Sequence, residues 1–321
     1  MTNYLLISAN AILNILVICV SLFLLYLIVC FIATAHLFKL TFKRNEKAAT
    51  QRNPIYNKYK DLLEEGEKYF FSLSPEEITL TSFDNLKLFA YFYNNPQAKG
   101  TVIFMHGYHG NPVKDFGPVL KLFKELGFSI LLPYQRAHGK SEGDYLTFGV
   151  KECNDCLKWA KYIANRFPNL PISLHGISMG GATVAMTATL PDLPKEVKLI
   201  ANDCGFTSPD KIVAAVRNSM KIPRFPFHYF ARFLAKTRAK FSLLENDASE
   251  CYAKNPLPSL FIHGEKDGFV PYYMGKENYE KSISVDKVLV SVKDADHGLS
   301  YITEPERVTK ILVDFYQKHM K

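Results

Sequence analysis

The chain has 321 residues, of which 48% are hydrophobic and 22% are charged. This length and composition suffice for one large hydrophobic core, and the absence of repeats or low-complexity tracts excludes a repeat protein. The net charge is +8 at neutral pH, but no recognised nucleic-acid-binding module accompanies it, so nucleic acid is not an expected partner.

The N-terminal segment is strongly apolar. The first 38 residues contain no Asp, Glu, Lys or Arg, and residues 15–35 form a run of 21 residues rich in Leu, Ile and Val. As a helix rising about 1.5 Å per residue, this run is roughly 31 Å long, close to the thickness of the hydrocarbon core of a bilayer. It also lacks the polar stripe expected of a helix on the core of a globular protein. We therefore predict a transmembrane anchor over residues 1–38.

A cleaved signal peptide is the alternative, because Ala33-Thr34-Ala35 resembles a cleavage site. Against it, the apolar stretch is too long and no Lys or Arg precedes it. The positive-inside rule predicts a single-pass protein with the domain that follows the anchor in the cytoplasm, and the extracellular side is the alternative. The six cysteines show no disulfide-framework spacing, which agrees with the cytoplasm. The basic residues that set the orientation all follow the anchor: Lys39, Lys43, Arg44, Lys47 and Arg52.

Residues 39–76 are expected to be a basic juxtamembrane tether, and residues 77–321 a single catalytic domain. In that domain short β-branched runs alternate with longer helical patterns, which is typical of an α/β protein with a mostly parallel sheet flanked by helices. The expected strands cover residues 78–82, 86–93, 101–105, 129–133, 172–175, 199–203, 260–263 and 288–292, and the helical patterns include residues 150–167 and 304–319.

Ser178 lies at the centre of Gly176-Ile177-Ser178-Met179-Gly180, after an apolar strand pattern and before a small-residue stretch that predicts a helix start. This is the pattern of a nucleophile elbow, in which glycines let strand and helix pass closely. A serine nucleophile needs a histidine as general base and a carboxylate that orients the histidine. His297 and Asp267 each follow a predicted strand, where side chains can converge on the elbow. We predict the triad Ser178, His297 and Asp267, with Asp203 as the rival acid.

The oxyanion hole requires two backbone N–H groups. Met179, directly after the serine, is the first expected donor, and Tyr108, in the loop after residues 101–105, is the second. Such a site needs no metal and no organic cofactor. Cys153 and Cys156 form a C-x-x-C inside a helical pattern without a second pair, so we interpret them as packing residues.

Three further motifs extend the pattern. They are H-G-x-x-x-N at residues 106–111, R-x-H-G-x-S-x-G at residues 136–143, and H-G-x-x-D-x-F-V-P at residues 263–271. With them, residues 77–319 resemble α/β-hydrolases of the monoglyceride lipase and serine aminopeptidase type, and more narrowly the membrane-anchored hydrolases of Gram-positive bacteria. The resemblance implies an α/β-hydrolase fold with a helical lid at about residues 205–255 and the triad above. Tyr134 and Gln135 stand where many relatives have an aspartate, which questions a structural ion pair at Arg136.

The lid segment combines basic and aromatic residues, with eight Lys or Arg against the single acid Asp210 between residues 205 and 241. This suits an anionic lipid surface or an acyl substrate with a negative head group; the alternative is a solvated cap whose aromatics pack on the core. The leading hypothesis is a membrane-anchored serine hydrolase that cleaves small-molecule carboxylic esters, with the lipid bilayer as a partner. A peptidase or thioesterase would use the same residues. A catalytically idle membrane-bound scaffold is the hypothesis of another class.

Overall fold

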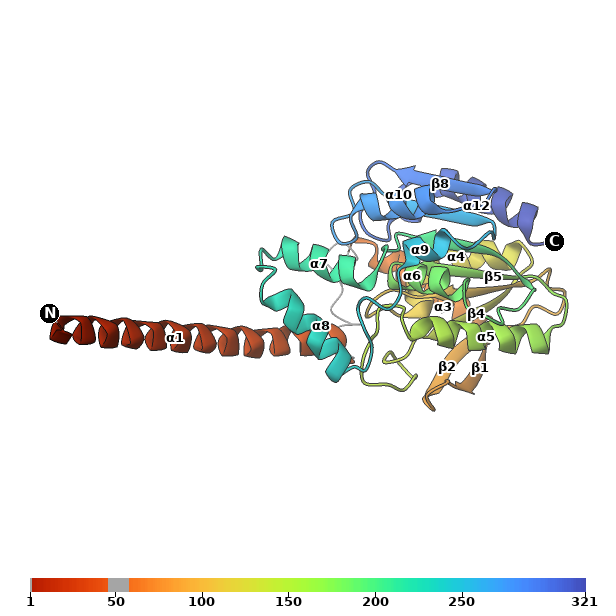
Figure 1. Cartoon of the computed structure of the whole chain (residues 1–321). Coiled ribbons are helices and arrows are strands. Elements are labelled where there is room, and N and C mark those ends of the chain that lie inside the picture. The colour runs from red at the N-terminus through yellow and green to blue at the C-terminus, as the bar shows by residue number, and fades with distance from the viewer. Residues whose placement is uncertain (1, 46–57) are drawn as a thin grey trace.

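The computed structural model describes residues 2–45 and 58–321. Its centre is an eight-stranded sheet with the strand order β1-β2-β4-β3-β5-β6-β7-β8 (Figure 1). The β1–β2 and β2–β4 pairs are antiparallel, and all other pairs are parallel. The prediction of a mostly parallel sheet is confirmed. The strands are β1 (Glu76–Thr81), β2 (Lys87–Tyr93), β3 (Thr101–Met105), β4 (Ser129–Tyr134), β5 (Ile172–Ile177), β6 (Val197–Asp203), β7 (Ser259–Gly264) and β8 (Lys287–Val292).

Helices cover both faces of the sheet, each over its own hydrophobic cluster. One cluster lies beneath α3, α4 and α12, and the other lies beneath α5, α6, α9 and α10. Strands β3, β5 and β7 are therefore fully buried, which explains their nearly continuous apolar sequences. The helices of these two layers are α3 (Lys60–Ser72), α4 (Pro112–Glu125), α5 (Glu152–Arg166), α6 (Met179–Thr187), α9 (Ala248–Tyr252), α10 (Tyr272–Lys281), α11 (Ser300–Thr303) and α12 (Pro305–His319).

Helix α1 (Thr2–Phe42) projects from the globular part (Figure 1). Its segment Ala9–Phe42 is long and apolar enough to cross a membrane, with a mean hydropathy of 3.2 in its most apolar window. The helix continues past residue 38, the expected end of the anchor. The last turns of α1 differ from the exposed N-terminal part because one of their faces is buried. This face consists of residues spaced four apart: Cys30, Thr34, Phe38 and Phe42.

The predicted tether differs from the observed structure in part. Residues 46–57 of the tether lie outside the described residues. Within its remainder, Lys60–Ser72 forms the helix α3, which buries Leu63, Gly66 and Phe70 and packs on α4. Gly66 and Gly117 of α4 lie so close that a Cβ on Gly66 would collide with the Gly117 backbone. The globular part thus begins before residue 77, the boundary expected from the sequence.

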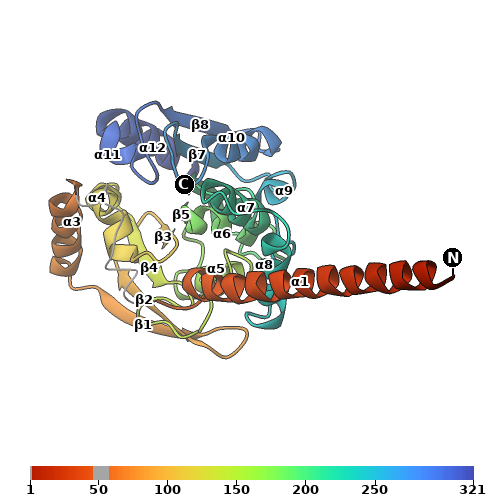
Figure 2. The ribbon, with the colours of Figure 1, turned by 90° about the vertical axis from the view of Figure 1, so that its left-hand side faces the viewer.

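The connection between β6 and β7 contains α7 (Pro209–Ser219), α8 (Phe227–Thr237) and the short helix α9. Figures 1 and 2 show α8 beside the C-terminal end of α1, where the Phe31 and Phe230 rings meet edge to face at 5.3 Å. Asp210 binds Arg232 through two hydrogen bonds of 2.7 and 2.6 Å and also binds His228. The lid aromatics differ in their surroundings. Phe230 and Phe233 contact Phe31 of α1, and Phe233 is still largely exposed, whereas Phe225 and Tyr229 are exposed without a contact to α1 among the ring contacts of the described residues.

Candidate active site

Ser178 lies on the sharp turn between β5 and α6 with φ 55° and ψ −118°, a conformation that residues with a side chain rarely adopt. Gly176 and Gly180 make this turn possible. A Cβ on Gly176 would collide with the carbonyl oxygen of Gly180, and a Cβ on Gly180 would collide with that of Met105 at the end of β3. The predicted strand, turn and helix around Ser178 are therefore all present, and the hydroxyl is held at the turn.

Three predicted side chains meet at this turn. His297 Nε2 lies 2.9 Å from Ser178 Oγ, and His297 Nδ1 lies 2.7 Å from Asp267 Oδ2. The carboxylate accepts a hydrogen bond from Nδ1–H, which leaves Nε2 free of its proton and able to accept the serine hydroxyl hydrogen. The arrangement has the geometry required for general-base activation of a serine.

Asp267 is fixed by four groups. Its Oδ1 accepts hydrogen bonds from the N–H groups of Phe269 and Val270 at 2.9 and 2.7 Å, and its Oδ2 faces both His297 and His263. Burial alone would raise the pKa of this carboxyl, but the hydrogen bonds and charges of His263 and His297 outweigh it and hold the pKa well below its usual range. The group is therefore an anion at neutral pH, in an orientation it cannot easily leave.

His263 begins the H-G-x-x-D-x-F-V-P motif but was not among the predicted site residues. Its Nε2 lies 2.9 Å from the Val270 carbonyl oxygen and 3.2 Å from Asp267 Oδ2. It therefore supports the carboxylate at Oδ2, the same oxygen that His297 contacts. The H-G-x-x-D spacing in the sequence is the signal that could have linked it to Asp267.

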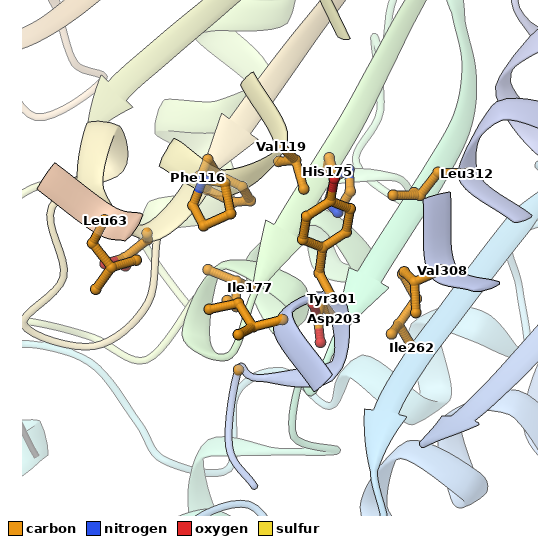
Figure 3. A pocket seen from close by; sticks show the side chains of 14 residues that line it. Leu63, Phe116, Val119, His175, Ile177, Asp203, Ile262, Tyr301, Val308 and Leu312 are labelled. Carbon is orange, nitrogen blue, oxygen red and sulfur yellow. The ribbon is translucent and has the colours of Figure 1, made fainter. Parts of the chain in front are cut away.

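Asp203, the rival acid, ends β6 and lines a small cavity of about 40 Å³ together with His175 and Ile177 (Figure 3). Its Oδ1 has no hydrogen-bond partner among the residues that the structure describes. Burial raises the pKa of its carboxyl to about 6. Because Nδ1 of His297 bonds to Asp267, the geometry favours Asp267 as the orienting acid.

The expected oxyanion donors lie on two sides of the serine. Within residues 2–45 and 58–321, neither the Tyr108 N–H nor the Met179 N–H donates a hydrogen bond. The loop that carries Tyr108 passes close to the nucleophile, since a Cβ on Gly107 would lie 3.4 Å from Ser178 Cβ. Asp115 Oδ2 accepts from Gly107 N–H at 3.1 Å and so fixes this loop. Both donors thus remain available for a developing oxyanion.

The remaining histidines of the motifs have structural partners. His106 Nε2 accepts a hydrogen bond from Gln135 N–H at 2.9 Å, His138 Nε2 accepts one from His109 N–H at 3.1 Å, and His175 Nδ1 lies 3.0 Å from the Tyr316 hydroxyl. Arg136, for which the sequence put a structural ion pair in doubt, is also paired, with Asp155 and Asp84.

Arg136 binds Asp155 of α5 at 2.7 Å and Asp84, between β1 and β2, at 2.8 Å. The substitution of Tyr134 and Gln135 for the aspartate of many relatives therefore leaves the arginine paired. Gln135 has taken another structural position, because its side chain contacts Thr183 of α6 as well as the His106 carbonyl.

One group of metal-type ligands exists among the described residues: Cys204, Asp267 and His297, with ligand atoms within 4.8 Å of one another. Burial raises the pKa of the Cys204 thiol well above its usual value, so the thiol stays protonated, whereas a metal binds the thiolate. Asp267 and His297 are already hydrogen bonded to each other. The donor set therefore fits a triad better than a metal centre. Cys153 and Cys156 are buried, free thiols of α5, whose pKa burial also raises.

Comparisons with known proteins agree with this geometry. A family model described as "Serine aminopeptidase, S33" matches residues 96–249. The solved structure of the esterase Pf2001 of Pyrococcus furiosus is similar with a TM-score of 0.64 and 25% identity, over 78% of this chain and 94% of that one. The chain belongs to the α/β-hydrolase superfamily. These matches support a hydrolase.

Curated relatives of this α/β-hydrolase occur in bacteria and fungi. It is 28% identical to the uncharacterized protein YqkD of Bacillus subtilis over 217 residues, which are 67% of this chain and 70% of YqkD. It is 25% identical to the uncharacterized membrane protein YNL320W of Saccharomyces cerevisiae over 231 residues, which are 71% of this chain and 75% of the relative.

Proposed function

We propose that this α/β-hydrolase is a membrane-anchored serine esterase that works through an acyl-enzyme. The observation that carries the proposal is the row of hydrogen bonds from Asp267 through His297 to Ser178, at 2.7 and 2.9 Å. A row of this kind has one chemical use, the activation of a serine hydroxyl, and a binding scaffold has no need of it. The idle scaffold suggested as an alternative is therefore disfavoured.

In the proposed reaction Ser178 Oγ attacks the ester carbonyl while His297 Nε2 takes the hydroxyl proton. The N–H groups of Tyr108 and Met179 bind the tetrahedral oxyanion, and the N-terminus of α6 adds its positive dipole end at the same place. His297 then gives the proton to the leaving alcohol. Water, activated by the same imidazole, hydrolyses the acyl-enzyme and releases the acid.

The surroundings of the site favour an ester over a peptide. An aminopeptidase must bind the α-ammonium group of its substrate, for which a carboxylate is the natural partner. A cavity of about 300 Å³ between α1 and the lid is lined in part by Tyr108 and Phe269. Its lining has no Asp or Glu among the described residues and is mostly apolar. A serine peptidase nevertheless remains the second candidate, because the matching family model is named for an aminopeptidase.

Membrane anchoring by α1 is the second part of the proposal. Residues 9–29 of α1 are exposed except for a half-buried Leu27, and exposed Leu, Ile, Val and Phe side chains of this number are stable only in a bilayer or a protein interface. A cleaved signal peptide fits less well, since Phe31, which precedes the candidate cleavage site, packs on the lid residues Phe230 and Phe233. The basic flank after α1 favours a cytoplasmic catalytic domain.

The test is labelling of the full-length protein in membranes with a fluorophosphonate probe. We expect labelling in the wild type and none in Ser178→Ala, while Ser173→Ala, a matched change at a buried serine of β5, the strand that leads to Ser178, keeps it. A panel of p-nitrophenyl esters and amino-acid anilides then sorts esterase from peptidase. An unlabelled wild-type protein that is folded would refute the proposal, and faster hydrolysis of anilides than of esters would replace the esterase with a peptidase.

A further inference from the structure

A cavity of about 300 Å³ lies between α1 and the lid, in the size range of about 300 to 1,000 Å³ that is usual for ligand pockets. One wall consists of α1 residues between Thr34 and Phe42, and the opposite wall consists of α7 and α8, with Val216 and Ala231 among its small side chains. Most of the lining is apolar. Arg217 adds a guanidinium whose Nε and Nη1 have no partner among the described residues and can donate to an oxygen of a ligand's polar end.

The inner end of this cavity adjoins the reacting groups. Tyr108, the expected oxyanion donor, and Phe269 both line it, and the Phe269 ring lies 5.2 Å from the His297 ring. The cavity near Asp203, by contrast, has a volume of about 40 Å³, enough for one or a few water molecules only. Of these two cavities, the one between α1 and the lid is the one with room for the chain of an ester bound at Ser178.

The cavity runs along α1 away from the triad and toward the bilayer. Thr41 lies at its inner end, where its carbonyl oxygen accepts a hydrogen bond from the Tyr108 hydroxyl, and Thr34 lies two turns closer to the N-terminus. At about 1.5 Å per residue these positions are roughly 10 Å apart along the helix axis. Residues 15–35 are the part of α1 predicted to span the membrane, so the far end of the cavity lies where α1 leaves the bilayer.

The C-terminal end of α1 is also built into the catalytic body. Arg44 Nη1 donates to the Ser141 carbonyl at 2.6 Å, and the Leu146 N–H donates to the Phe42 carbonyl at 2.8 Å. The Phe42 ring packs on Phe148, which lines the same cavity. A helix that served only as an anchor would not need to form a wall of a pocket beside the triad.

We propose that the cavity between α1 and the lid binds the acyl chain of an ester drawn from the bilayer, so that the membrane helix is itself part of the substrate site. This inference rests on the proposed esterase function and adds the substrate class. At about 30 Å³ for each methylene group, close to the volume of one water molecule, a 300 Å³ cavity takes a chain of on the order of ten carbons. The substrate is accordingly a lipid-like ester with a medium-length chain.

The experiment compares two substrates on the full-length protein in phosphatidylcholine vesicles: p-nitrophenyl acetate, which does not reach the cavity, and p-nitrophenyl decanoate, which fills it. The readout is the ratio of the two kcat/KM values, because a loss of folded protein cancels in this ratio. Thr34→Phe narrows the cavity from α1, and Ala231→Phe narrows it from α8. Ile32→Phe is the matched control, since Ile32 lies on the exposed face of α1.

We expect the ratio of kcat/KM for p-nitrophenyl decanoate to kcat/KM for p-nitrophenyl acetate to fall at least about tenfold in Thr34→Phe and in Ala231→Phe. The loss of room for a few methylene groups has an effect of about this size. Ile32→Phe should leave it unchanged. A ratio that stays at the wild-type value in both cavity variants would overturn the acyl-chain pocket while the esterase function stands. A wild-type protein that hydrolyses neither ester would remove the proposed function, and this inference with it.

Discussion

The hydroxyl of Tyr108 donates a hydrogen bond of 2.8 Å to the carbonyl oxygen of Thr41, in the last turn of α1. Carbonyl groups in the last turn of a helix lack a partner within the helix, so this bond satisfies one of them. It also joins the loop that carries an expected oxyanion donor to the helix predicted to cross the membrane. Burial raises the pKa of the Tyr108 hydroxyl, which therefore remains a donor.

Tyr108→Phe removes this bond and keeps the backbone N–H in place. We expect a loss of about 1 kcal/mol of stability, the usual net contribution of one buried hydrogen bond, and at most about a tenfold fall in kcat for p-nitrophenyl acetate. Thermal unfolding and steady-state kinetics measure both. Tyr145→Phe, at a tyrosine whose ring packs on Phe38, is the matched control. A fall of a thousandfold would instead indicate that the hydroxyl itself binds the oxyanion.

Asp267→Asn tests the orienting acid. The amide cannot hold His297 with its proton on Nδ1, so the imidazole presents the wrong nitrogen to Ser178, and we expect kcat to fall by on the order of 10⁴. Steady-state kinetics with p-nitrophenyl acetate measure this fall in kcat. Asp203→Asn should lose far less activity, because the hydrogen bond of His297 Nδ1 goes to Asp267. Equal losses in the two variants would contradict the assignment.

Asp203→Asn also tests a pH effect on stability. The folded-state pKa of Asp203 is raised to about 6 from the ordinary 3.8. Below pH 4 the carboxyl is protonated in both states, and between about pH 4 and 6 only the unfolded chain ionises, so the folded protein loses stability as the pH rises through this window. Above about pH 6 the folded protein is destabilised by the full amount, which is up to about 3 kcal/mol for a difference of two pKa units.

The neutral amide of Asp203→Asn has no such cost. We therefore expect the variant to gain Tm over the wild type at pH 7.5 and to gain much less at pH 4. Differential scanning calorimetry at both pH values measures the difference. A Tm difference that is independent of pH would show that the Asp203 pKa is not raised in the folded state.

Asp296 is predicted to position the two loops of the triad. Its Oδ1 accepts hydrogen bonds from His297 N–H at 2.7 Å and from Gly268 N–H at 2.9 Å, so it joins the loop of the base to that of the acid. Asp296→Ala should lower kcat by roughly 10 to 100 fold with little change in KM, since a small misplacement of a catalytic group has an effect of this size. Asp294→Ala is the control, because the ion pair of Asp294 within the described part of the chain is with exposed Lys266. An unchanged kcat would refute the positioning role.

Much of the fold was predictable because it depends on local patterns. The strands predicted at residues 101–105 and 288–292 are β3 and β8 to within a residue, since buried parallel strands are short apolar runs between turns. The elbow at Ser178 was equally predictable, because its sharp turn requires glycines at fixed distances on either side of the serine. The helix α3 was missed: its burial of Leu63 and Phe70 depends on α4, about fifty residues away, and its own sequence is rich in charge.

The sequence by itself determined the alternation of strands and helices, the apolar helix at the N-terminus and the order serine, acid, histidine, because each of these follows from short local patterns and from their order along the chain. Only the tertiary structure decided that Asp84 and Asp155 pair with Arg136 and that α1 lines a cavity beside the triad. These are contacts between residues far apart in the chain. Their existence depends on how the packed layers bring side chains together, which no local pattern encodes.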